Sequence, residues 1–289
     1  PRINKSSPIC FFNSAILSAI AASSGPISSF VKSMAHMGND IVMGVPQHSV
    51  QVLLFQPCTA PDNTMQAWVG GERLHLGAEA EVISGSWYDR PAILKKRQSR
   101  GWRHPDLDKH LTSKRMTNEV KLTIWLAEMG APVPAIWDVD LEEGIIIMER
   151  IEGQPLIEVL QSKQYDGTLL HNVGKSIRLF HRNAICHGDL STNNILINSE
   201  GHAVLIDLGL ATREYELEGF GIDLHVLHEI LRASHPNIEN AMDEVLTGYL
   251  ELDDELGQVP EAPGGQPPSA KDVVKRLEQI MKRVRYHGG

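Results

Sequence analysis

The sequence is poor in cysteine, in long hydrophobic runs and in basic residues. Its three cysteines, Cys10, Cys58 and Cys186, are too few and too scattered for a disulfide scaffold or a zinc cluster, and they favour a reducing compartment. No apolar run reaches the ~18–20 residues that span a bilayer, so no membrane helix is predicted. Because 36 acidic residues outnumber 27 Lys and Arg, giving a net charge of −9, a stand-alone nucleic-acid or membrane-surface binder is disfavoured.

The amino-terminal segment carries no motif to which a function can be assigned. A semi-apolar run over residues 9–22, broken by polar residues, follows two basic residues and is a weak version of an export or transit signal. We instead expect residues 1–66 to form a poorly ordered extension, with Met65 as a plausible translation start. Near Trp68 the sequence changes to runs that predict strands and helices. With 42% hydrophobic residues overall, the chain can bury a sizeable core.

The predicted elements change from strand-rich to helix-rich along the chain. Apolar and β-branched runs predict strands over 72–85, 91–97, 133–140 and 144–149, and two short strands over 195–197 and 203–206. Helical spacing predicts helices over 105–128 and 167–184 and helix for most of the chain after residue 206. This order indicates an α+β protein with a small sheet lobe over 67–150 and a mainly helical lobe over 151–289.

The most informative motif is HGDLSTNN at 187–194, followed after a short hairpin by DLG at 207–209. This spacing is typical of phosphoryl transfer, which depends on positioning and on neutralising phosphate charge. Magnesium prefers hard oxygen ligands, and Asn194 and Asp207 offer an amide and a carboxylate oxygen. Asp189 is the predicted acceptor of a proton from the attacking hydroxyl or water. A purely local role, with Asp189 capping a turn, explains fewer of these residues.

A lysine–glutamate pair is expected upstream of this motif. Kinases place a lysine on a strand and a glutamate on the next helix; here Lys95 ends a strand and Glu119 lies on the following predicted helix. Lys95 would hold the α- and β-phosphates of ATP, and Glu119 would fix its ammonium group. Lys96 is a rival for this role, but neighbouring residues of a strand point to opposite faces, so only one of them can face the site.

The predicted phosphate loop and hinge carry weaker signals. Gly77, Ala78, Glu79 and Ala80 stand where kinases have a loop with three glycines, and a single glycine leaves fewer backbone amides free to approach phosphates. The segment from Glu149 to Ile151 follows an apolar strand, where the backbone of a hinge would meet adenine.

Taken together, these motifs resemble the small atypical serine/threonine kinase/ATPase subunit of the EKC/KEOPS complex. The resemblance covers about residues 66–285 and includes two blocks that are much more specific than the HGD motif, the GAEA loop and the WRHP block. The matching segments are GAEA 77–80, KKR 95–97, WRHP 102–105, 115–119, ERIEG 149–153, HGDLSTNN 187–194, IDLGL 206–210 and GIDLHVL 221–227.

This resemblance implies a minimal bilobal protein-kinase-like fold that binds ATP and magnesium. It further implies support of threonylcarbamoyladenosine modification of tRNA, a link to telomere maintenance and transcription, and a place in the cytoplasm and nucleus. The implied partners are the threonylcarbamoyl-transferase subunit and a small regulatory subunit docking on the sheet lobe, with tRNA contacted only through the complex. Asp223 would be a buried aspartate that supports the loop carrying Asp189.

Two features of the sequence predict how such an enzyme is regulated. Gly188 stands where regulated kinases carry an arginine that grips a phosphorylated loop, and the segment between Asp207 and Asp223 is short. We therefore expect an enzyme that is not switched by activation-loop phosphorylation and handles peptides poorly. Two alternatives remain open from sequence: a small-molecule phosphotransferase of the aminoglycoside or choline kinase type, and a nucleotide-binding scaffold without turnover.

Overall fold

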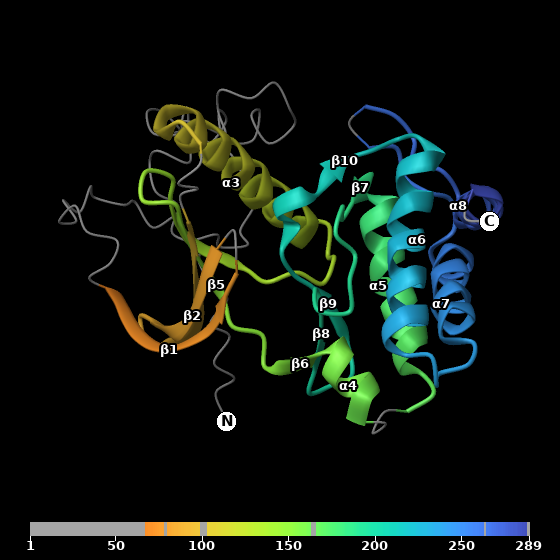
Figure 1. The fold of residues 1–289 in the computed structure, drawn as a ribbon, viewed down its shortest axis with the longest axis horizontal. Coiled ribbons are helices and arrows are strands. Elements are labelled where there is room, and N and C mark those ends of the chain that lie inside the picture. Colours follow the sequence, from red (N-terminus) through yellow and green to blue (C-terminus); the bar gives the residue numbers. More distant parts are fainter. Residues whose placement is uncertain (1–66, 78–79, 99–102, 163–165, 263, 288–289) are drawn as a thin grey trace, which may run out of the picture.

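A five-stranded antiparallel sheet forms the first part of the folded chain (Figure 1). The computed structural model describes residues 67–77, 80–98, 103–162, 166–262 and 264–287, so the extension predicted over residues 1–66 lies outside the described residues. The strands are hydrogen-bonded in the order β1-β2-β3-β5-β4. Their bounds are Trp68–Leu76 (β1), Ala80–Trp87 (β2), Arg90–Arg97 (β3), Ile136–Asp140 (β4) and Ile145–Glu149 (β5).

Helix α3 (Pro105–Glu128) packs against one face of this sheet. Pro105 occupies the first turn, where its missing N–H costs nothing, and two aspartates in that turn complement the helix dipole. Met116 and Val120 of the helix contact Val139 and Ile146 of the sheet. The opposite face of the sheet buries a second small cluster formed by Ala92, Leu94, Ile145 and Ile147, against which Trp68, Trp87 and Trp137 pack.

The second part of the chain is mainly helical. Helix α5 packs against α7, and α6 packs against α8 (Figure 1). The main hydrophobic core lies between these helices and three short strands, and its members include Val173, Ile177 and Phe180 of α5. The bounds are Leu156–Ser162 (α4), Leu169–Arg182 (α5), Leu217–Ser234 (α6), Ala241–Leu256 (α7) and Ala270–His287 (α8).

Short strands frame the loop at 187–194. Strands β6 (Gly153–Pro155), β8 (Ile195–Asn198) and β9 (Ala203–Leu205) form a three-stranded sheet, and β7 (Ile185–Cys186) pairs with β10 (Thr212–Arg213). A single 3-10 turn, η2 (Leu208–Leu210), follows β9. The hairpin β8–β9 therefore connects the 187–194 loop to Ile206 and Asp207.

The α+β fold class and its order of elements are confirmed, with local corrections. The helix predicted over 105–128 has those bounds, but the strand predicted over 72–85 is wrong because it is two strands joined at a turn, where the amide of Gly77 donates to the carbonyl of Ala80. The prediction of helix after residue 206 missed β10 and η2. The division into lobes at 150/151 stays a prediction; β5 ends at Glu149 and β6 begins at Gly153.

Candidate active site

Lys95 joins the sheet, helix α3 and the loop after β9. Its Nζ lies 2.6 Å from Glu119 Oε1 and 2.7 Å from Asp207 Oδ1. The Lys95 side chain is only 8% exposed and that of Glu119 3%, whereas that of Asp207 is 48% exposed. The pair expected from sequence is thus formed, and it is tied to the first residue of the DLG motif.

Strand alternation decides between the two candidate lysines. Lys95 is buried and lies on the face of β3 that α3 covers, opposite Ile146 of the core cluster under that helix. Lys96 is exposed and lies on the other face of the strand. Because successive side chains of a strand point in opposite directions, Lys95 is the only one of the two that can reach Glu119.

Asp189 and Asn194 are brought together by the 187–194 loop. Asn194 Nδ2 donates to the carboxylate of Asp189 at 3.0 Å and to its backbone carbonyl at 2.9 Å. Ile206, the residue before Asp207, donates its amide to the Asn194 carbonyl at 2.9 Å, while its own carbonyl accepts from His187 Nε2 at 2.9 Å. Both ends of the loop therefore fix the backbone next to Asp207.

The donor set at this site fits a divalent cation. Asp207 has a left-handed backbone, φ 59° and ψ 67°, which turns the chain sharply after the hairpin. Although partial burial opposes ionisation, the Lys95 ammonium lowers the pKa of the Asp207 carboxyl below its ordinary value. Since the amide nitrogen of Asn194 is used on Asp189, its Oδ1 is the atom left to offer. An ionised carboxylate and an amide oxygen are the hard ligands that Mg²⁺ prefers.

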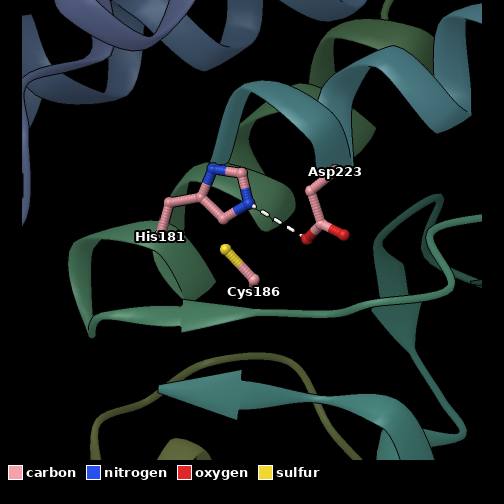
Figure 2. A group of neighbouring side chains, drawn as sticks. All are labelled: His181, Cys186 and Asp223. Atoms are coloured by element: carbon pink, nitrogen blue, oxygen red, sulfur yellow. Dashed lines mark hydrogen bonds and ion pairs between the residues drawn. The ribbon is translucent and has the colours of Figure 1, made fainter. Parts of the chain in front are cut away.

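Asp223 of α6 binds the backbone at the start of the 187–194 loop. Its carboxylate accepts the amides of His187 at 2.6 Å and Gly188 at 2.9 Å, as the resemblance implied. Figure 2 shows His181 of α5 aimed at the same carboxylate, with Nε2 at 3.3 Å from Oδ2. Burial opposes ionisation of Asp223, but the bond from His181 and the loop amides keep its pKa below the ordinary value.

Cys186 lies beside the same pair, and these three residues are of types that can bind a metal ion. Ligand atoms of His181, Cys186 and Asp223 lie within 4.8 Å of one another (Figure 2). However, burial and the charge of Asp223 raise the pKa of the Cys186 thiol far above its ordinary value, and a thiol binds metal as the thiolate. The oxygens of Asp223 already accept two amides. The group is therefore a hydrogen-bonded support of the loop.

Gly188 is required by the backbone at this point. Its φ is +78°, and a Cβ built on it would lie 2.4 Å from the carbonyl oxygen of Leu210. An L-residue with a side chain is disfavoured by both features. The position that carries an arginine in loop-regulated kinases is thus closed here by the segment after Asp207.

The hinge and phosphate-loop predictions are placed only in part. The amide of Glu149 donates to Ala135 O and that of Arg150 to Pro91 O, so these two amides are engaged within the sheet. The Glu149 carboxylate accepts the Ala135 amide at 3.1 Å. Gly77 and Ala80 form the turn between β1 and β2, whereas Ala78 and Glu79 lie outside the described residues.

Sequence reasoning assigned no role to two residues that contact this site. Arg97 binds the second oxygen of Glu119, and Asn118 of α3 donates to the carbonyl of Ala211. Strand alternation was the available signal for Arg97, because it lies two positions after Lys95 and hence on the same face of β3. Asn118 had no such signal, since its partner is a backbone atom far along the chain.

Comparison with known proteins identifies the family. A model of the RIO domain matches residues 92–237, just over half of the chain. The KEOPS complex subunit Bud32 of Pyrococcus abyssi is 32% identical over 219 residues, which cover 73% of this chain and 94% of that relative. The chain belongs to the Bud32 family of RIO-domain kinases. The family resemblance stated from the sequence is thereby confirmed, and the chain is an atypical kinase, a phosphotransferase that binds nucleotide.

Two further relatives differ in how much of their own length this chain covers. The EKC/KEOPS complex subunit bud32 of Dictyostelium discoideum is 31% identical, over 74% of this chain and 83% of the relative. A probable bifunctional tRNA threonylcarbamoyladenosine biosynthesis protein of Methanothermobacter thermautotrophicus is 33% identical, but this chain spans only 36% of its length. Among the described residues, no helix combines the length and apolarity needed to cross a membrane.

Proposed function

We propose that this protein is an atypical serine/threonine kinase/ATPase that uses Mg-ATP as a subunit of a KEOPS complex and supports threonylcarbamoyladenosine modification of tRNA. The observation that carries the proposal is the contact of Lys95 with both Glu119 and Asp207. It joins the sheet to the DLG motif across the place where a kinase holds its nucleotide. The names of the Pyrococcus and Methanothermobacter relatives support the complex and the tRNA modification.

Each charged residue has a role that follows from its surroundings. On ATP binding, Lys95 turns its ammonium from Asp207 to the α- and β-phosphates, while Glu119 keeps it in place. Asp189, which is exposed at the front of the loop, accepts the proton of the attacking hydroxyl or water as the γ-phosphoryl group passes to that oxygen and ADP leaves. Asn194 and Asp207 would hold magnesium, which would neutralise charge on the phosphates.

Adenine is proposed to meet the backbone between Glu149 and Ile151. The amides of Glu149 and Arg150 already donate to the sheet, so the Glu149 carbonyl and the Ile151 amide are the groups assigned to the base. The phosphates are proposed to lie next to Gly77 and Ala80, with Ala78 and Glu79 assigned to the same phosphate-binding segment on their place in the sequence alone. With one glycine, this segment contributes less to binding than the loop of other kinases, and Lys95 contributes more.

The proposed partners are the threonylcarbamoyl-transferase subunit and a small regulatory subunit that docks on the sheet. Strand β1 is the edge of the sheet, and Val69, Leu74 and Leu76 on it are 65%, 49% and 54% exposed. An edge strand with exposed apolar side chains is a surface that a partner can cover. We place the complex in the cytoplasm and nucleus, with tRNA contacted only indirectly.

Magnesium-dependent ATP hydrolysis by the full chain, with and without its partners, tests this function. We expect Asp189→Ala and Asp207→Ala each to lower kcat by about 10²–10³-fold, as for loss of a charge-stabilising group in other enzymes. Asp243→Ala, which changes an exposed aspartate of α7, serves as the control and should keep the wild-type rate. Equal rates in the wild type and both site variants would instead indicate a nucleotide-binding scaffold.

A further inference from the structure

Glu119 of α3 is held by two cations from the same strand. While Lys95 binds Oε1, Nη2 of Arg97 lies 2.5 Å from Oε2, and the Arg97 side chain is only 7% exposed. Lys95 and Arg97 are two positions apart on β3 and so share one face. Each oxygen of Glu119 therefore has its own partner, and one contact persists if the other is released.

Arg97 and Asn118 also reach the segment after Asp207. The guanidinium of Arg97 lies over the DLG motif, because a Cβ on Gly209 would come within 2.6 Å of Arg97 Nη2. One residue before Glu119, Asn118 Nδ2 donates to the carbonyl of Ala211 at 2.9 Å. Helix α3 is thus tied on one side to the sheet through Arg97 and on the other to the residues that follow η2.

These ties oppose an outward movement of α3. The lysine–glutamate pair must be in place for catalysis, and many kinases are controlled by moving the helix that carries the glutamate. Here such a movement would separate two nearly buried charges, Arg97 and Glu119, and an unpaired buried charge is costly. Release of Lys95 from Asp207 when nucleotide binds leaves the Arg97–Glu119 pair intact.

We propose that Arg97 is a positioning residue that, together with Asn118, holds α3 in its inward position before any nucleotide binds. This inference rests on the proposed use of Lys95 as the phosphate ligand. The ATP site is then assembled permanently, and turnover is controlled by what binds the protein and not by displacement of α3. Arg97 acts through Glu119 and does not itself contact the phosphates.

Amide hydrogen exchange of α3 in the full chain tests the positioning role without requiring activity. Nucleotide-free wild type should show the same α3 protection as the Mg-ATP-loaded chain, within about twofold. Arg97→Met should speed nucleotide-free exchange in α3 by about 10-fold or more, because local opening free energy sets exchange. Lys96→Met, which removes the exposed cation on the opposite face of β3, is the matched control and should leave α3 unchanged.

Kinetics of ATP hydrolysis provide the second readout. Arg97→Met should lower kcat by about 10–100-fold, since small misplacements of reacting groups cost up to ~10²-fold, with less than about a threefold change in KM for ATP. Arg97→Lys should restore part of kcat, and Asn118→Ala should show a smaller loss of the same kind. If Arg97→Met does not fold, these two milder variants decide the question.

The outcomes separate the two proposals. The proposed function is overturned if the wild-type chain fails to bind Mg-ATP. The positioning role can still be tested in that case, because its test compares the amide exchange rates of α3 in nucleotide-free Arg97→Met and Lys96→Met. The positioning role is overturned if α3 becomes protected in the wild type only when Mg-ATP is added, or if Arg97→Met behaves like Lys96→Met. A rise in KM with unchanged kcat would make Arg97 a phosphate ligand and overturn it equally.

Discussion

Two charged clusters lie on either side of the 187–194 loop, and they differ in how their charges are used. The front cluster consists of Lys95, Arg97, Glu119 and Asp207, and the rear cluster of Arg178, His181, Asp223, Tyr249 and Asp253. The front cluster joins two parts of the chain and includes a carboxylate that is 48% exposed, whereas the side chain of Arg178 at the rear is 0% exposed. The carboxylate proposed to bind the metal is thus half-exposed, whereas the guanidinium at the centre of the rear cluster is out of contact with solvent.

The rear cluster forms a continuous hydrogen-bonded chain with defined directions. Arg178 Nη1 donates to Tyr249 OH at 3.3 Å, and Tyr249 OH lies 2.7 Å from His181 Nδ1. The Asp223 carboxylate can only accept, so His181 Nε2 donates to it; in the neutral ring Nδ1 then accepts from Tyr249. The pKa of His181 is lowered by burial, which agrees with this assignment. The chain ends on the amides that begin the 187–194 loop.

Removal of Asp253 should have the largest effect on stability. Its carboxylate accepts two bonds from Arg178 at 2.8 Å, one from Arg182 at 2.6 Å and the Ala270 amide at 2.7 Å. Asp253→Ala leaves two buried guanidinium groups without this partner, and we expect a loss of about 3–5 kcal/mol in the free energy of unfolding. Urea denaturation followed by circular dichroism measures this loss.

Two further variants compare the contributions of the front and rear clusters to the free energy of unfolding. Asp254→Ala changes the exposed neighbour of Asp253 on α7 and should shift stability by less than about 0.5 kcal/mol. Asp207→Asn in the front cluster should cost at most about 1 kcal/mol of stability, because its half-exposed ion pair is screened by water, while it impairs ATP hydrolysis. A stability loss for Asp207→Asn as large as that for Asp253→Ala would break the distinction.

Gly188 provides the next largest effect, at the point where the two clusters meet. Gly188→Ala should lower the free energy of unfolding by about 1–2 kcal/mol because of the positive φ. The contact between the added Cβ and the Leu210 carbonyl should lower it by a further ~1–3 kcal/mol through strain. Gly130→Ala is the matched control, because Gly130 has φ +75° but nothing within 4 Å of its added Cβ. Equal losses of stability in the two variants would show that the Leu210 carbonyl does not restrict the side chain at position 188.

The sequence predicted the front cluster better than the rear one, for a physical reason. Lys95, Glu119 and Asp207 stand in segments that match the kinase pattern, and strand alternation separates Lys95 from Lys96, so local sequence was sufficient for these three; Arg97 was given no role. Of the rear residues only Asp223 was named, and only through the family resemblance. A buried network of this kind has no spacing rule, because its members are chosen by whichever side chains tertiary packing brings within hydrogen-bonding distance.

The fold showed the same division between local and long-range information. Helix α3 was predicted to the residue because apolar residues at helical spacing follow Pro105 with few breakers among them. The strand predicted over 72–85 ran through the turn at Gly77, although the same residues were also predicted as a phosphate loop, because local apolar pattern alone does not mark where a strand ends. Strands β7 and β10 are two residues each. Their pairing depends on the path of the segment after Asp207, which a window of local sequence does not contain.

Tyr249→Phe should have a moderate effect that separates fold support from catalysis. The change removes the hydroxyl that donates to His181 and accepts from Arg178, and leaves a buried histidine nitrogen without its partner. We expect a loss of about 1–2 kcal/mol in unfolding free energy with Mg-ATP affinity unchanged, measured by urea denaturation and by titration of a fluorescent ATP analogue. Weakened nucleotide binding at full stability would place Tyr249 functionally with the front cluster.

The smallest predicted effect is the pH dependence that His181 gives to the rear cluster. Its folded pKa lies below the ordinary value because of burial, while the unfolded residue titrates near about 6.5. Below that pH the unfolded chain binds a proton that the folded chain does not, so stability falls as pH falls, by at most about 1.4 kcal/mol per pH unit. Arg178 and His187 oppose protonation of His181 and Asp223 favours it.

Unfolding free energies at pH 7.5 and 5.5 test this sign. His181→Gln should lose less stability between the two pH values than the wild type, although His235, whose pKa is also lowered by burial, leaves a residual slope. His202→Gln, at an exposed position, should keep the wild-type slope. An unchanged slope in His181→Gln would mean that the pKa of this histidine is the same in the folded and the unfolded chain, and would contradict the neutral assignment. A larger loss in His181→Gln than in the wild type would mean that His181 is protonated in the fold, with Nδ1 donating to Tyr249 OH while Nε2 still donates to Asp223.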